Sequence, residues 1–219
     1  MLTHRSRYAP RMLRTLGVLL AFLLVAAACG DDDAARPAAP SGGVFTISNQ
    51  GGTMEGHTPR GFPGMGTGLF AGDDLNPGFP AGDGVQIYLT FDLSPIPQAT
   101  IRSAVLAAAP ARIAGSPFDD LGALRVEAVR YDTFGPHLFD LAAIGGTASC
   151  GLAESAEGPF QCDLRSEVQR ALDEGNPAQF RVLFERSGDG DGQPDLAMFF
   201  VSDSNTNEPG IFTLTVDAG

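Results

Sequence analysis

The sequence contains no lysine and no tryptophan, and the missing lysines leave arginine as its only fixed cation. It has fourteen arginines and twenty-six acidic residues. Four of the arginines precede residue 15 and every acid follows residue 30, so removal of an N-terminal leader would leave ten arginines, twenty-six acids and a net charge of −16. A charge of this sign and size repels phosphate backbones, so we expect no nucleic-acid partner.

Recognisable catalytic motifs are also missing. After a leader only His57 and His137 would remain. There is no Gly-x-Ser-x-Gly elbow, no His-Glu-x-x-His helix and no phosphate-binding glycine loop at a helix start. Carboxylates are frequent, but no pair stands out as the acid and nucleophile of a glycosidase. We therefore predict that the protein is not an enzyme, and keep a carboxylate-based glycoside hydrolase as an alternative.

Residues 1–28 have the layout of a lipoprotein signal peptide. A basic segment precedes an apolar run, Leu16 to Ala28, that is too short to span a bilayer comfortably. The run ends in small residues immediately before Cys29, which resembles the lipobox of bacterial lipoproteins. We predict that Cys29 is lipidated, with acyl chains as the membrane anchor. The alternative is an ordinary signal peptide whose cleavage site lies beside a cysteine.

Residues 29–43 are predicted to be a disordered tether that links this anchor to a folded domain at 44–219. The tether contains an acidic triplet, Asp31 to Asp33, with proline, glycine and serine but no large apolar residue. The expected location is therefore the bacterial cell envelope, with the protein exported and lipid-anchored. The expected partners are the membrane, through the lipid, and either a polysaccharide or an envelope protein.

The stretch from Val85 to Ala109 has the clearest strand signal. Apolar and polar residues alternate from Val85 to Leu93, which is the pattern of a half-buried strand. Pro95 and Pro97 then interrupt the run, because proline cannot donate to a sheet ladder. A second apolar pattern begins at Ile101. We expect two strands joined by a turn that form the core of a β-domain.

The remaining chain predicts further short strands, many turns and one helix. Leucines and valine at helical spacing indicate a short amphipathic helix at Leu164–Glu174, with Asp163 as N-cap and Gly175 after its end. Residues 51–84 are so rich in glycine and proline that they are predicted to be mainly loop, and 116–120 a turn. The predicted fold is an all-β, antiparallel jelly-roll β-sandwich of eight or nine strands with one short helix. The other expected strands are 44–48, 68–72, 124–131, 158–164, 180–184, 196–201 and 211–216.

Five segments in this order resemble the DNRLRE-type β-sandwich domain, which is akin to a group of carbohydrate-binding modules. The most specific is FDLSPIPQATIRSAVL, within residues 88–106. The resemblance spans residues 44–217 and implies a secreted, non-catalytic jelly roll of the kind often appended to larger cell-surface proteins. Here we expect the module to act without a catalytic domain. The other segments are TGLFAGDD (67–74), GSPFDDLGALRVEAV (115–129), CDLRSEVQRALDEG (162–175) and QFRVLFE followed by GDGDGQPD (179–195).

Two cysteines remain once Cys29 is assigned to the lipid. In an exported protein, Cys150 and Cys162 are most simply a disulfide. A reactive or metal-binding thiol pair is the alternative, although no histidine lies near them in the sequence.

The acidic loop between residues 187 and 195 predicts a calcium site. Carboxylates alternate with glycines there, and a tight loop can turn several oxygens inward to give the six to eight ligands that calcium takes. The expected ligands are Ser187, Asp189, Asp191, the carbonyl of Gln193, and Asp195. The loop is not an EF-hand, because Met198 occupies the position of the bidentate glutamate. A solvated acidic hairpin without an ion is the alternative.

Sugar binding is the more specific of the expected functions. It commonly relies on flat aromatic side chains, and here the candidate is Tyr88, on the polar face of the predicted strand. The alternatives are an ordinary sandwich surface and a Tyr88 side chain covered by the glycine-rich loop. Phenylalanines in loop segments either line a cleft or pack beneath a loop. The expected function is thus a lipid-anchored envelope protein that displays a non-catalytic β-sandwich for glycan or protein binding, with a structural component lacking a soluble ligand as the alternative.

Overall fold

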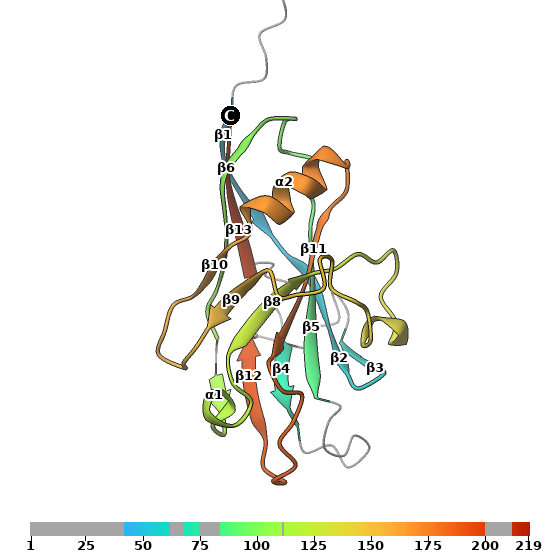
Figure 1. Ribbon diagram of the computed structural model, residues 1–219, viewed down its shortest axis with the longest axis vertical. Coiled ribbons are helices and arrows are strands. Elements are labelled where there is room, and N and C mark those ends of the chain that lie inside the picture. Colours follow the sequence, from blue (N-terminus) through green and yellow to red (C-terminus); the bar gives the residue numbers. More distant parts are fainter. Residues whose placement is uncertain (1–41, 62–67, 75–83, 111, 200–211) are drawn as a thin grey trace, which may run out of the picture. The chain divides into compact units, whose positions relative to one another are not determined.

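The structure is a computed structural model and describes residues 42–61, 68–74, 84–110, 112–199 and 212–219. The predicted signal peptide, the lipidation site Cys29 and nearly all of the tether lie outside these residues. The described part is an all-β sandwich of two antiparallel sheets, as predicted (Figure 1). Whether its topology is that of a jelly roll remains a prediction.

The smaller sheet has four strands. Their order is β1 (Gly43–Ser48), β13 (Phe212–Ala218), β6 (Ile101–Ala108) and β10 (Phe160–Asp163). Residues alternate between buried and partly exposed along β13, because one face of this sheet faces the core.

The larger sheet has nine strands. Its main path runs β7 (Arg112–Ala114), β12 (Asp195–Phe199), β4 (Leu69–Asp73), β5 (Val85–Phe91), β11 (Ala178–Phe184), β8 (Leu124–Ala128) and β9 (Cys150–Ala153). In addition, β2 (Gln50–Glu55) pairs with β5 and with β3 (Thr58–Gly61).

Aromatic side chains join the two sheets in the core. Phe199 on β12 and Phe212 on β13 are both fully buried, with ring centroids 4.8 Å apart. Phe160 on β10 packs edge-on against Phe199, with ring centroids 6.0 Å apart. Burial of such rings, together with the aliphatic side chains of the core, holds one sheet on the other.

The central stretch forms two strands, as predicted, but the two strands do not lie in the same sheet. Val85–Phe91 and Ile101–Ala108 are strands, but β5 lies in the larger sheet and β6 in the smaller one. They do not pair, since the segment with Pro95 and Pro97 carries the chain from one sheet to the other. The expected count was also low, because the described residues contain thirteen strands. The extra strands include β2 and β3, in a region predicted to be mainly loop, and β9.

The predicted helix is α2 (Arg165–Asp173), which lies across one end of the sandwich (Figure 1). Its buried residues are Val168, Ala171 and Leu172. Asp163 accepts a hydrogen bond from the Arg165 backbone N–H at 2.9 Å, although Leu164 is the N-cap residue itself. Gly175 follows the helix with a φ of +67°, as a C-terminal glycine should.

A second short helix, α1 (Pro117–Asp120), replaces the turn expected there. It lies at the opposite end of the sandwich from α2, near the turn that joins β11 to β12 (Figure 1). This end carries the acidic residues considered below.

Part of the outer face of the larger sheet is covered by an irregular segment, residues 130–141, which we call the cover segment. It contains the 3-10 turn η1 (Pro136–Leu138), and Leu138 and Phe139 pack on Tyr88 and Met54. The segment is held by Arg181 on β11. The Arg181 guanidinium donates to Glu127 through Nε (3.0 Å) and to the Phe139 carbonyl through Nη1 (3.1 Å).

Tyr88 is therefore buried. The prediction that it stacks on a ligand required an exposed side chain. Tyr88 is 0% exposed, and its hydroxyl lies within hydrogen-bond distance of two acceptors, the Leu138 carbonyl (2.6 Å) and the Gln86 side-chain oxygen (2.7 Å), to one of which it donates. Burial raises the pKa of the phenol to about 12. The alternation placed Tyr88 on the correct face of β5, but the cover segment shields that face.

Cys150 and Cys162 form the predicted disulfide. Cys150 lies on β9 in the larger sheet and Cys162 on β10 in the smaller one, with their Cα atoms 6.0 Å apart. The bond therefore ties the two sheets together, beyond closing the short segment between the cysteines. Among the described residues, no helix is long and apolar enough to cross a membrane.

Candidate metal centre

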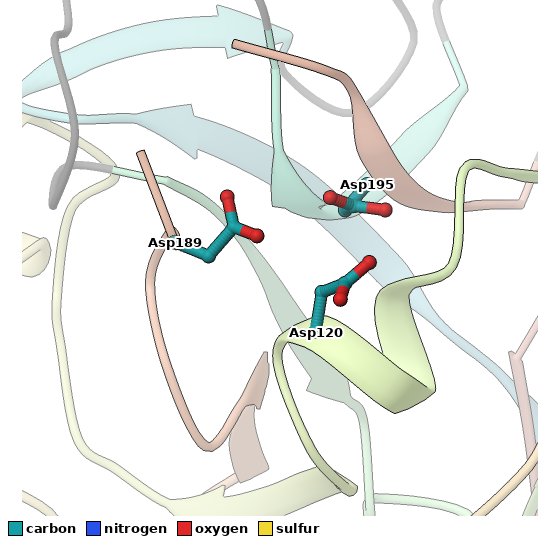
Figure 2. A group of neighbouring side chains, drawn as sticks. All are labelled: Asp120, Asp189 and Asp195. Carbon is teal, nitrogen blue, oxygen red and sulfur yellow. The ribbon is translucent and has the colours of Figure 1, made fainter. Parts of the chain in front are cut away.

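Three aspartates converge at the end of the sandwich that carries α1. Asp120, Asp189 and Asp195 each offer a carboxylate oxygen, and these three oxygens lie within 4.8 Å of one another. Figure 2 shows the three carboxylates turned toward one another from three separate segments. They belong to α1, to the β11–β12 turn and to the start of β12.

Asp195 is the buried member of the group. Its side chain is 1% exposed, and Oδ1 accepts a hydrogen bond from the Ser116 backbone N–H at 2.6 Å. The other oxygen, Oδ2, is buried and has no hydrogen-bond partner in the described part of the chain. A buried carboxylate oxygen without a partner is costly in free energy, which makes this oxygen a candidate cation ligand.

Two glycines hold the neighbouring chain close against Asp195. At Gly115, where φ is +67°, a Cβ would lie 2.3 Å from the Asp195 Oδ1. At Gly72, where φ is +132°, a Cβ would lie 1.9 Å from the Asp195 carbonyl oxygen. Because no other residue tolerates both that conformation and that contact, these positions require glycine. The pairing of β12 with β7 and β4 brings both glycines to this place.

The β11–β12 turn places Asp189 opposite Asp195. Asp189 Oδ1 accepts from the Asp191 N–H at 3.0 Å, and Asp191 Oδ1 accepts from the Gln193 N–H at 2.6 Å. Gly190 and Gly192 have φ values of +77° and +78°. The alternation of aspartate and glycine thus makes two successive turns closed by side chains.

The negative charges of this region repel one another, and this repulsion affects the pKa values of its carboxyl groups. Burial raises the pKa of the Asp195 carboxyl, the Ser116 hydrogen bond lowers it, and the charges of Asp120, Asp189 and Asp191 raise it further. The pKa of Asp73 is also raised, first by burial, against a hydrogen bond from the Asp189 backbone, and then by Asp189, Asp195 and Asp74. A bound cation would relieve this repulsion.

The donor set suits a hard divalent cation. All three ligands are carboxylate oxygens, without histidine or cysteine in the group. Calcium binds oxygens at about 2.3–2.6 Å, so two ligands of one ion lie no more than roughly 4.6–5.2 Å apart. The separation of these three oxygens is within that limit.

The structure brings together only part of the predicted calcium set. Asp189 and Asp195 are in the group, and Asp191 is not. The carbonyl of Ser187 lies against Gly84, where a Cβ would be 2.0 Å away, and Gln193 is exposed.

Sequence reasoning missed Asp120, which belonged to a predicted turn sixty-nine positions before Asp189. Only the pairing of Leu196 with Ala114 brings that turn to the acidic loop. The acidic pair after Pro117 was visible in the sequence, but nothing local linked it to the loop.

Comparison with known proteins found no matching family model and no matching curated protein.

Proposed function

We propose that this protein is a lipid-anchored protein of the bacterial cell envelope whose sandwich is a non-catalytic module for glycan or protein binding, with calcium at the Asp120–Asp189–Asp195 centre. The role of the ion is to fix the β11–β12 turn and α1 against the sheet. The resemblance to DNRLRE-type modules and the signal-peptide layout of residues 1–28 motivate the envelope location.

The observation that carries the calcium proposal is the buried, unpartnered Oδ2 of Asp195 beside two other carboxylates. In a folded protein without an ion, that oxygen would forgo the hydrogen bonds it makes to water in the unfolded chain. A calcium ion supplies the partner, and it compensates three adjacent negative charges at once.

Export is supported by the disulfide between Cys150 and Cys162, because such bonds persist in oxidising compartments. The alternative of a carboxylate-based hydrolase has less support at this centre. Asp195 is 1% exposed, so a sugar could not reach its carboxylate. A structural envelope component would use the same calcium centre and would differ in having no soluble ligand.

Calcium titration of the protein tests this proposal, with calorimetry for affinity and thermal unfolding for stability. Extracellular calcium sites have Kd values of about 10⁻⁴–10⁻³ M. With Kd near 10⁻⁴ M and about 10 mM calcium, the free energy of unfolding should rise by about 2.7 kcal/mol. For a domain of this size the Tm should then rise by about 5–10 °C.

Asp195→Asn and Asp120→Asn should abolish the calcium response. Asp191→Asn is the matched control, because the amide oxygen can still accept the Gln193 N–H while the charge beside the centre is removed. This variant should retain most of the response. Equal loss in all three variants would show that only the general charge of the loop matters, and no response in the wild type would overturn the calcium proposal.

A further inference from the structure

A pocket of about 400 Å³ lies on the outer face of the larger sheet, beside the cover segment. It is formed by β2, β5, β11 and the cover segment, and shares no residue with the metal centre. Its volume is near the lower end of the roughly 300–1,000 Å³ typical of small-molecule sites.

Strand register builds the floor of the pocket. Gln50 pairs with Thr90, and Thr90 pairs with Gln179. Directly opposite residues of antiparallel strands share a face, so these neutral polar side chains form one row across three strands. In the adjacent row Gly52 pairs with Tyr88 and adds no side chain, which leaves room above the sheet.

Two aromatic residues of the cover segment, Tyr131 and Phe134, form the wall. The Tyr131 backbone is held by Gln179, which accepts from its N–H at 3.0 Å and donates to its carbonyl at 2.9 Å. Its hydroxyl lies 2.8 Å from the Thr90 hydroxyl. Phe134 stands edge-on to Tyr88 beneath it, with centroids 6.0 Å apart. The wall is therefore fixed in place before any ligand arrives.

The charge of the pocket selects against anions. Its lining, as far as the structure describes it, contains no arginine, and the single charged residue is the exposed Asp132. The nearest buried cation, Arg181 in the adjacent row, is already paired with Glu127 and with the Phe139 carbonyl. A phosphate or a carboxylate would therefore meet a negative charge without a compensating cation.

We infer that this pocket binds one neutral sugar unit, as the terminal residue of a glycan. Aromatic walls offer apolar surface to the C–H faces of a sugar ring, while the row of amide and hydroxyl groups can exchange hydrogen bonds with its hydroxyls. The small volume favours a terminal unit over an extended chain. The inference rests on the proposed binding function and assigns its glycan ligand to this pocket.

The test is calorimetric titration of the full-length protein in mild detergent, with calcium present. The neutral probes are methyl glucoside, methyl galactoside, methyl mannoside and N-acetylglucosamine, and the anionic probe is galacturonate. At least one neutral probe should bind, and galacturonate should bind at least tenfold more weakly. Phe134→Ala should weaken binding of the neutral probe by tenfold or more.

Gln50→Ala provides a second variant, because the Gln50 side chain is exposed and its removal leaves the core intact. It should weaken binding severalfold even if Phe134→Ala fails to fold. Val44→Ala is the surface control, since Val44 is 70% exposed on the other sheet, and it should bind like the wild type.

The outcomes separate the pocket from the general proposal. A neutral sugar that binds equally to the wild type and to both pocket variants would overturn the pocket and leave glycan binding intact. Preference for galacturonate would overturn the charge argument. Absence of binding by every probe would overturn this inference. It would not affect the calcium proposal, which the calcium titration tests separately.

Discussion

The buried ion pair of Arg181 and Glu127 should be essential to the cover segment that shields Tyr88. Their side chains are 10% and 18% exposed, and the guanidinium also reaches the Phe139 carbonyl. Removing one partner of a buried pair costs about 3–5 kcal/mol, because the other charge is left uncompensated. Since this pair is not completely buried, we expect Glu127→Ala to lower the free energy of unfolding by about 3 kcal/mol.

Urea denaturation measures this change. With a slope of about 2–3 kcal/mol/M, the midpoint should fall by about 1–1.5 M. The matched control is Glu174→Ala, which removes the acid of the half-exposed Arg130–Glu174 pair and should cost no more than about 1 kcal/mol. The double variant Glu127→Leu/Arg181→Met should recover only part of the loss, because no charge is left unpaired but the Phe139 carbonyl still lacks its donor. Equal losses for Glu127→Ala and Glu174→Ala would refute the claim that the pair is buried beneath the cover segment.

Three further predictions concern the bond between the sheets, the buried phenol and the glycine beside the metal centre. The disulfide closes a short loop, with its cysteines 12 positions apart, so Cys150→Ala/Cys162→Ala should cost about 3 kcal/mol in thermal unfolding; an unchanged Tm would contradict this. Burial raises the pKa of Tyr88 from 10.0 to about 12, so the unfolded chain loses this proton first. Stability should therefore fall as the pH rises from 10 to 12, by up to about 2.7 kcal/mol, and Tyr88→Phe should lose this part of the decline. Tyrosinate absorbance near pH 10 from a folded Tyr131→Phe sample that begins at Cys29 would argue against it. At Gly115, alanine would place a Cβ 2.1 Å from the Pro194 carbonyl oxygen, so Gly115→Ala should weaken calcium binding by at least tenfold and destabilise the fold by about 1–3 kcal/mol. Gly145→Ala, at a φ of +86° with open space around it, should carry only the backbone strain and leave calcium affinity unchanged.

Local patterns were sufficient to predict the strongly periodic elements. Alternation predicted β5 and β11, and helical spacing predicted α2 to within one residue at each end. In these segments burial of one face dictates both the conformation and the sequence. The Cys150–Cys162 bond was predictable from the number of cysteines together with the expectation of export.

Features that depend on distant partners were not predictable in this way. The glycine pair in β2 gives no alternation, and β2 is a strand because it pairs with β5 from Gln50 to Glu55. The burial of Tyr88 depends on which segment covers the outer face, and the sequence of that segment is irregular. Asp120 joins the metal centre only through the pairing of β7 with β12.

A crystal structure determined with calcium, using the anomalous signal of the ion, tests the central claim most directly. The proposal predicts one peak with oxygens of Asp120, Asp189 and Asp195 at about 2.3–2.6 Å, and with Asp195 Oδ2 as one of the ligands. The claim would be contradicted by a structure in which no peak appears at saturating calcium and Asp195 Oδ2 accepts a hydrogen bond from the protein instead.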